Sequence, residues 1–222
     1  NRKRGNLKSL VSSFGIVLKN RRYVYYVLQM GFAMGVLFAN ISSSPFIVQQ
    51  HYGFSAFEFS LFFGINALAI GLAAGLSVKF KNPEHAMFLG SVGMTMMSAV
   101  EFVILSNEYH FAVYEAVLFV LLFSMGLTFT ASTTLAMDCE RANSGTASAL
   151  FGAAGFAFGG IVSPLVGLGD ILSTTGLIFF VCSVCSLCFS VLAMNQTHTN
   201  LWGSFKCKMG PVTRFVFLRR EK

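Results

Sequence analysis

The sequence predicts an all-α polytopic membrane protein, built as a bundle of six transmembrane helices. Charged residues make up only 11% of its 222 residues, whereas a soluble domain has roughly 25%. Residues 23–50 contain no charged side chain, and about 20 apolar residues suffice to cross a bilayer as a helix. A second uncharged run, residues 59–78, follows a short polar connection. The two runs therefore predict a helical hairpin through lipid.

The N-terminal stretch, residues 1–22, carries seven of the sixteen Lys and Arg residues and has apolar residues at helical spacing. This pattern predicts an amphipathic helix on the cytoplasmic membrane surface. A basic arm for nucleic acid is the other interpretation, but contact with lipid explains the apolar stripe better. We therefore expect no nucleic-acid partner.

The transmembrane bundle is expected over residues 23–194, and a basic cytoplasmic tail over residues 195–222. Short polar connections separate the apolar runs, and the segment 43–46, which contains Pro45, is expected to interrupt the helix there. The expected spans are residues 23–50, 59–78, 85–106, 111–137, 144–167 and 173–194.

The basic residues predict the orientation of the six spans. All sixteen lie in the N-terminal stretch, the second and fourth connections, or the tail, which places them on one side of the bilayer. Positive residues mark the cytoplasmic side, so both ends are expected in the cytoplasm of a cell-membrane protein. The chain opens on Asn1 with no signal peptide, and we expect a fragment of a longer protein.

Small residues predict where the helices pack closely, because lipid gives helices no hydrophobic reason to associate. Three glycine pairs with a spacing of four residues occur in the first, second and fifth spans. In the fifth, Gly152, Gly155 and Gly159 precede Pro164, which predicts either a bend with a sliding contact or tight static packing.

Polar residues inside the spans are the candidate substrate-binding residues. Asn40 and Asn66 fall near the middle of the first and second spans, and Gln29 lies nearer the cytoplasmic side. These side chains could line a substrate cavity or hydrogen-bond one helix to another. Both interpretations remain open from the sequence.

Two acidic residues, Glu101 and Glu115, lie at similar depth on either side of the third connection. If they face each other, repulsion would make them a proton-binding pair. Alternatively both lie near the outer interface within reach of water, and the sequence favours this second arrangement. Glu115 is retained as a candidate substrate-binding residue.

The sequence indicates no enzyme, cofactor or metal site. Cys182, Cys185 and Cys188 recur every three residues, which on a helix spreads the thiols around the circumference inside lipid. They are interpreted as small apolar side chains. No catalytic or phosphate-binding motif stands out.

Several segments resemble the C-terminal half of a Bcr/CflA-type drug-resistance transporter of the major facilitator superfamily. The similarity covers about residues 5–194, and the first and fourth of its segments are specific in combination. The segments are ISSSPFIVQ at 41–49, YGFS at 52–55, FGINA at 63–67, GTASALFG at 145–152 and SPLVG at 163–167.

This resemblance implies half of a twelve-helix fold, whose missing N-terminal six-helix half would be a partner. It also implies proton-coupled efflux of drugs or small amphipathic compounds by alternating access in a bacterial inner membrane. It favours Asn40, Asn66 and Glu115 as cavity residues. The Lys79–Pro83 turn departs from the family's loop motif, and the usual coupling acids belong to the absent half. A sugar or metabolite carrier and a non-transporting scaffold or remnant are the alternatives.

Overall fold

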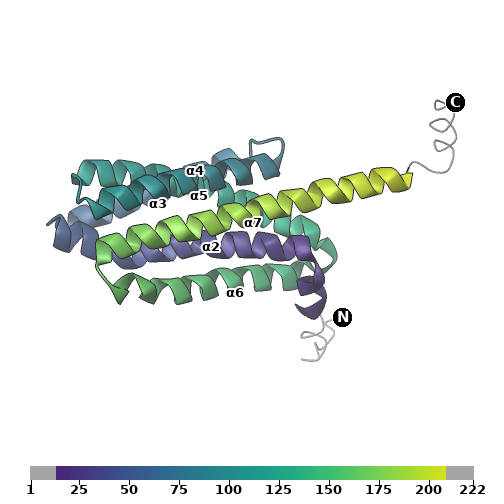
Figure 1. The fold of residues 1–222 in the computed structure, drawn as a ribbon, viewed down its shortest axis with the longest axis horizontal. Coiled ribbons are helices and arrows are strands. Elements are labelled where there is room, and N and C mark those ends of the chain that lie inside the picture. The colour runs from purple at the N-terminus through teal and green to yellow at the C-terminus, as the bar shows by residue number, and fades with distance from the viewer. Residues whose placement is uncertain (1–13, 209–222) are drawn as a thin grey trace, which may run out of the picture.

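The computed structural model describes residues 14–208, with side chains up to residue 196, and folds this part into a helical bundle (Figure 1). Six of the described helical segments are long and apolar enough to cross a membrane, which confirms the predicted all-α six-span fold. The elements are α2 (Arg21–Pro45), η1 (Phe46–His51), α3 (Ala56–Ser77), α4 (Pro83–Ser106), α5 (Phe111–Cys139), η2 (Arg141–Asn143), α6 (Ser144–Val162), η3 (Ser163–Leu168) and α7 (Ile171–Lys208).

The predicted interruption at residues 43–46 is wrong, because the chain stays helical through Pro45 to His51. Proline lacks a backbone N–H and its ring clashes with the carbonyl four residues earlier. Directly after Pro45 the chain widens into the π-helical turn η1, at whose end the Tyr52 N–H donates to the Ile47 carbonyl. Gly53 then adopts a positive φ of 76°, which turns the chain towards α3 and which glycine adopts without strain.

Polar side chains at the connections define where the next helices begin. Ser55 and Glu58 form a reciprocal capping box at the start of α3. Asn82 accepts a hydrogen bond from the Glu84 N–H at the start of α4, and Asp170 accepts one from the Ser173 N–H at 2.9 Å before α7. These caps satisfy N–H groups that have no partner within the helix. Each of these helices therefore begins at a defined residue after a short polar connection.

The bundle repeats one packing arrangement twice. The helices α2 and α5 are the most buried spans and pack against each other at the centre. α5 packs on α3 and α4, and α2 packs correspondingly on α6 and α7, while α4 and α7 also meet. Successive helices are antiparallel, so the units α2–α4 and α5–α7 are related by an inverted arrangement. α2 and α5 therefore present residues to the interior along most of their length.

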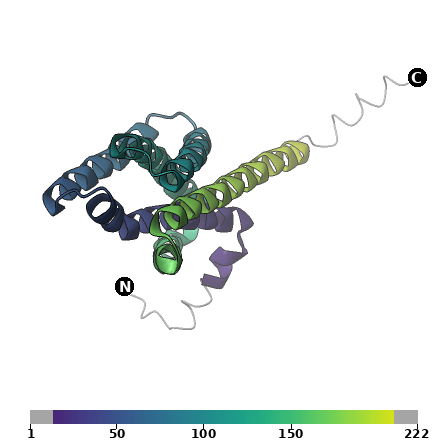
Figure 2. The same ribbon diagram turned by 60° about the vertical axis from the view of Figure 1, so that its left-hand side comes forward.

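The two ends of the described chain depart from the predicted boundaries. Residues 14–19 are helical, but Asn20 is extended and caps α2, so Arg21 and Arg22 belong to the first span. Residues 1–13 of the predicted amphipathic helix lie outside the described residues. α7 continues past residue 194 to Lys208 and projects beyond the other helices in Figures 1 and 2. Residues 209–222 of the predicted tail also lie outside.

Glycines let α2 and α6 approach closely. A Cβ added at Gly31 would lie 2.7 Å from the Phe158 ring of α6, and one added at Gly159 would collide with the Phe38 ring of α2. Each helix thus receives an aromatic ring of the other in a space left by a glycine. The glycine pair of the second span, Gly71 and Gly75, has no neighbouring atom within 4 Å of an added Cβ in the described part of the chain.

Candidate functional site

Asn66 of α3 and Glu115 of α5 meet inside the bundle. The Asn66 Nδ2 donates to Glu115 Oε1 at 2.9 Å. Their other oxygens, Asn66 Oδ1 and Glu115 Oε2, are buried and have no hydrogen-bond partner within residues 14–196. Both residues line a cavity of about 10 Å³ together with Ser44, Val48, Phe59, Phe62, Phe63 and Leu118.

This cavity is close to the smallest that holds a single water molecule. Asn66 Oδ1 and an ionised Glu115 Oε2 can only accept hydrogen bonds. An occupant that contacts these two oxygens in that state must therefore donate hydrogen bonds or carry a positive charge. The sequence identified both residues, but only the packing of α3 on α5 joins them.

An open apolar groove lies beside the small cavity and shares Phe62 and Glu115 with it. The groove has a volume of about 470 Å³, within the range of small-molecule sites, which combine apolar walls with a few polar groups. Among the described residues that line it, Glu115 is the ionisable one. The remaining lining residues are Ile65, Phe111, Ala112, Ala116 and Phe119.

Asn40 contributes indirectly to this site. Its side chain is buried, and its Oδ1 accepts a hydrogen bond from the Ser44 Oγ one turn later, at 2.8 Å. Ser44 lines the small cavity, whereas Asn40 does not. Asn40 therefore orients Ser44. Ser44 was not identified from the sequence as a residue of the site, although it lies four residues after Asn40, about one helical turn.

Gln29 ties three helices together away from this cavity. Its Nε2 donates to the Ser186 Oγ of α7 at 3.1 Å, its Oε1 accepts from Ser132 of α5, and Ser186 donates back to the Gln29 carbonyl at 3.0 Å. Eleven residues separate it from Asn40, which is about 16 Å along a helix. These bonds hold α2, α5 and α7 together, whereas the sequence predicted Gln29 as a substrate-binding residue.

Glu101 of α4 is deeper than the sequence suggested. Its side chain is 0% exposed, so it does not lie at a water-reached interface. Both carboxyl oxygens lack a hydrogen-bond partner in the described part of the chain, and the residue interacts electrostatically with Glu115. Tyr114 is also fully buried and lies within electrostatic range of both carboxyl groups, while its hydroxyl has no hydrogen-bond partner within residues 14–196. The structure thus brings together two acids that the sequence placed only at equal depth.

The predicted packing residues of α6 have different surroundings. An added Cβ at Gly155 would contact Met34 at 3.3 Å and one at Gly159 would meet Phe38, but one at Gly152 would meet no described atom within 4 Å. α6 ends at Val162, and Pro164 falls in the first turn of η3, where a missing N–H costs little.

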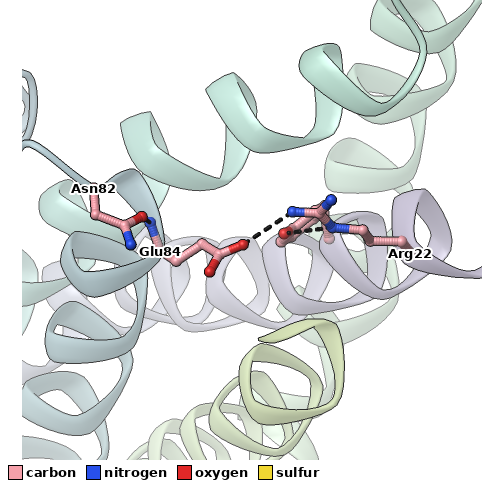
Figure 3. Close-up of polar contacts among 4 residues, drawn as sticks. Arg22, Asn82 and Glu84 are labelled. Atoms are coloured by element: carbon pink, nitrogen blue, oxygen red, sulfur yellow. Dashed lines mark hydrogen bonds and ion pairs between the residues drawn. The ribbon is translucent and has the colours of Figure 1, made fainter. Parts of the chain in front are cut away.

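A second polar cluster joins the first turns of α2 and α4. The Arg22 Nη2 lies 2.9 Å from Glu84 Oε1, as Figure 3 shows, and Asn82 caps the turn that carries Glu84. Arg22 also donates to the Tyr26 hydroxyl at 3.2 Å. The Glu84 side chain is only 11% exposed, so this ion pair is partly desolvated. It links the two helices at the end of the bundle where Asn20 bonds Glu140.

Within the described residues, no three His, Cys, Asp or Glu side chains are close enough to hold a metal ion. Cys182 is buried, Cys185 is partly buried and Cys188 is exposed. The three thiols therefore point in different directions from α7, as the helical spacing requires.

Comparison with known proteins gives two matches. Residues 1–164 match the family model described as Major Facilitator Superfamily. The chain is 34% identical over 195 residues to an uncharacterized MFS-type transporter, YdgK, of Bacillus subtilis (strain 168). The match covers 86% of this chain and 48% of that protein. The chain thus spans about half the length of the relative.

Proposed function

Since the chain belongs to the major facilitator superfamily, a family of membrane transporters rather than enzymes, we propose that it forms one half of a proton-coupled exporter of small amphipathic compounds. The proposed mechanism is alternating access, in which this six-helix half rocks against an N-terminal six-helix half. The positive-inside distribution of Lys and Arg supports a cell-membrane location with both ends in the cytoplasm, as in a bacterial inner membrane.

The observation that carries this proposal is the apolar groove lined by Glu115, whose carboxyl group is hydrogen-bonded to Asn66 in the adjoining small cavity. Phe62, Phe111 and Phe119 supply apolar surface of the kind that accepts ring-containing molecules of varied shape. The hydrogen-bonded pair gives a fixed polar point against which such a molecule orients. Asn40 acts by holding Ser44, and Gln29 acts by holding the helices.

Proton coupling is proposed because acidic groups inside the spans are costly and mark proton or ion sites in membrane carriers. In the proposed coupling, a proton and a substrate compete for the Glu115 carboxyl group, which lines the groove. Release of substrate on one side would then accompany proton uptake there.

The test is efflux of a panel of amphipathic dyes and drugs from cells that express the native polypeptide containing this chain. Asn66→Leu removes the donor to Glu115, and a lost hydrogen bond of about 1 kcal/mol weakens binding roughly fivefold. We expect the variant to lose protection against these compounds. Asn107→Leu, at an exposed turn residue, is the matched control and should keep it.

Full protection by Asn66→Leu would contradict the assignment of this site. If the native protein exports none of the amphipathic compounds but moves a sugar or another metabolite, the proposed substrate class is wrong. If it moves no solute, the transport proposal itself is wrong.

A further inference from the structure

Among the residues that the structure describes, no hydrogen-bond donor or ion-pair partner stabilises a charge on the buried Glu101. Its side chain is fully buried, and neither carboxyl oxygen has a hydrogen-bond partner within residues 14–196. The ion pairs in that part of the chain are Arg22 with Glu84 and Arg141 with Asp138. An isolated buried carboxylate costs several kcal/mol. The neutral, proton-carrying form is therefore the one that this site accommodates.

Several of the described titratable groups lie close enough to Glu101 to interact with it electrostatically. From α5, Glu115 and Tyr114 interact with it electrostatically, and from the connection after η1, Tyr52 does so as well. Tyr52 also interacts with Glu108 in the exposed turn between α4 and α5. None of the described titratable groups of α7, which also packs on α4, interacts with Glu101.

Tyr52 and Tyr114 are neighbours close to the buried acids, and within residues 14–196 neither hydroxyl is hydrogen-bonded to Glu101 or Glu115 in this conformation. The ring centroids of Tyr52 and Tyr114 are 5.8 Å apart. The Tyr52 hydroxyl donates to the Tyr109 carbonyl at 2.8 Å, and burial together with the nearby Glu101 and Glu108 raises the pKa of Tyr52. It therefore keeps its proton at ordinary pH. A tyrosine hydroxyl both donates and accepts, so it can hand on one proton while receiving another.

We propose that Glu101 is a proton-binding residue that receives its proton from the turn containing Glu108, by way of Tyr52, and exchanges it with Glu115 by way of Tyr114. In each exchange the neutral Glu101 carboxyl loses one proton, the Glu115 carboxylate gains one, and Tyr114 donates one while accepting one. The role rests on the proposed proton-coupled transport. It adds a residue of α4 that does not line the substrate groove, and a route from the exposed turn to that groove.

The experiment uses the native polypeptide that contains this chain, reconstituted in vesicles, and a compound found in the efflux panel. Glu101→Gln keeps the volume of the side chain but cannot release a proton, and Glu101→Asp keeps the acid. Asp138→Asn removes an exposed acid at the far end of α5 and is the control. Two quantities are measured: substrate accumulation driven by an imposed pH gradient, and the infrared band of protonated carboxyl groups, identified by its shift in deuterated water.

We expect Glu101→Gln to lose gradient-driven accumulation, Glu101→Asp to retain part of it, and Asp138→Asn to resemble the native protein. The infrared band of the native protein should lose intensity in Glu101→Gln alone. Native accumulation in Glu101→Gln, or an unchanged band in that variant, would overturn the inference. If the native protein transports without responding to the gradient, the proposed coupling fails, and the infrared band by itself decides whether Glu101 holds a proton.

Discussion

The contact of α3 with α5 at Gly126 holds the candidate site together. A Cβ added at Gly126 would lie 2.5 Å from the Ile70 carbonyl oxygen and 3.0 Å from the Ile70 Cα. These are backbone atoms, which cannot move aside as a side-chain end can. Ile70 lies one helical turn from Asn66, so Gly126→Ala is expected to push the part of α3 that carries Asn66 away from α5.

The size of this effect follows from the distances. Ordinary carbon contacts lie at about 3.5–4.0 Å, so the two helices must separate by about 1 Å. The 2.9 Å bond from Asn66 to Glu115 would then exceed hydrogen-bond range. Overpacking costs about 1–3 kcal/mol and the lost bond about 1 kcal/mol, while alanine gains about 1 kcal/mol of helix propensity over glycine. The net expectation is a destabilisation of about 2 kcal/mol with loss of transport.

The assay is thermal unfolding of the purified protein in detergent, paired with efflux of the best panel compound. Gly71→Ala is the matched control, because an added Cβ on that glycine of α3 meets no described atom within 4 Å and alanine should slightly stabilise the helix. Gly126→Ala should unfold several degrees below the native protein, and Gly71→Ala at or above it. Equal unfolding temperatures and equal efflux for both variants would refute the reasoning.

Three further predictions concern the ends of the helices. Glu84→Gln breaks the partly buried ion pair with Arg22 that Figure 3 shows. It should lower the free energy of unfolding by about 1–3 kcal/mol, less than the loss of a fully buried pair would cost. An unchanged free energy of unfolding would contradict a stabilising role for this ion pair. Tyr23→Phe removes a 2.6 Å bond to the Ala147 carbonyl of α6 and should cost about 1 kcal/mol by the same unfolding assay. Asp170→Ala should destabilise α7 at neutral pH, because hydrogen bonds from Ser173 lower the pKa of Asp170. Because the folded-state pKa lies below the unfolded value of about 3.9, this stabilisation is fully present above that value and is lost as the pH falls through the lower, folded-state pKa. The difference from the native protein should shrink over that acidic range, and a constant difference from neutral to acidic pH would argue against the cap.

The number and approximate limits of the spans could be predicted because the bilayer imposes them locally. A helix needs a certain length of uncharged sequence, and residues 59–78 and 144–167 satisfied this without reference to any other part of the chain. The helix through Pro45 could not be predicted, because proline is compatible both with a break and with a π-helical turn.

The candidate site was only partly predictable. Asn66 and Glu115 stood out as polar groups inside apolar runs, but their sequence separation says nothing about which face of each helix meets the other. The same limitation hid the difference between Gln29, which bonds Ser132 and Ser186, and Asn66, which borders the cavity.

The sequence by itself determined that this chain is a six-span membrane bundle with its Lys and Arg residues on one side of the bilayer. Hydropathy and charge determine this through their interaction with lipid and water, so no particular partner residue is needed. Only the tertiary structure decided that Glu101 is buried beside Tyr114 and Glu115, that Gly31 and Gly159 each receive a ring of the opposite helix, and that Gly71 receives none. Those outcomes depend on the rotation of each helix about its axis. That rotation is determined by side-chain packing of α2 on α6 and of α3 on α5, pairs of helices that are not consecutive along the chain.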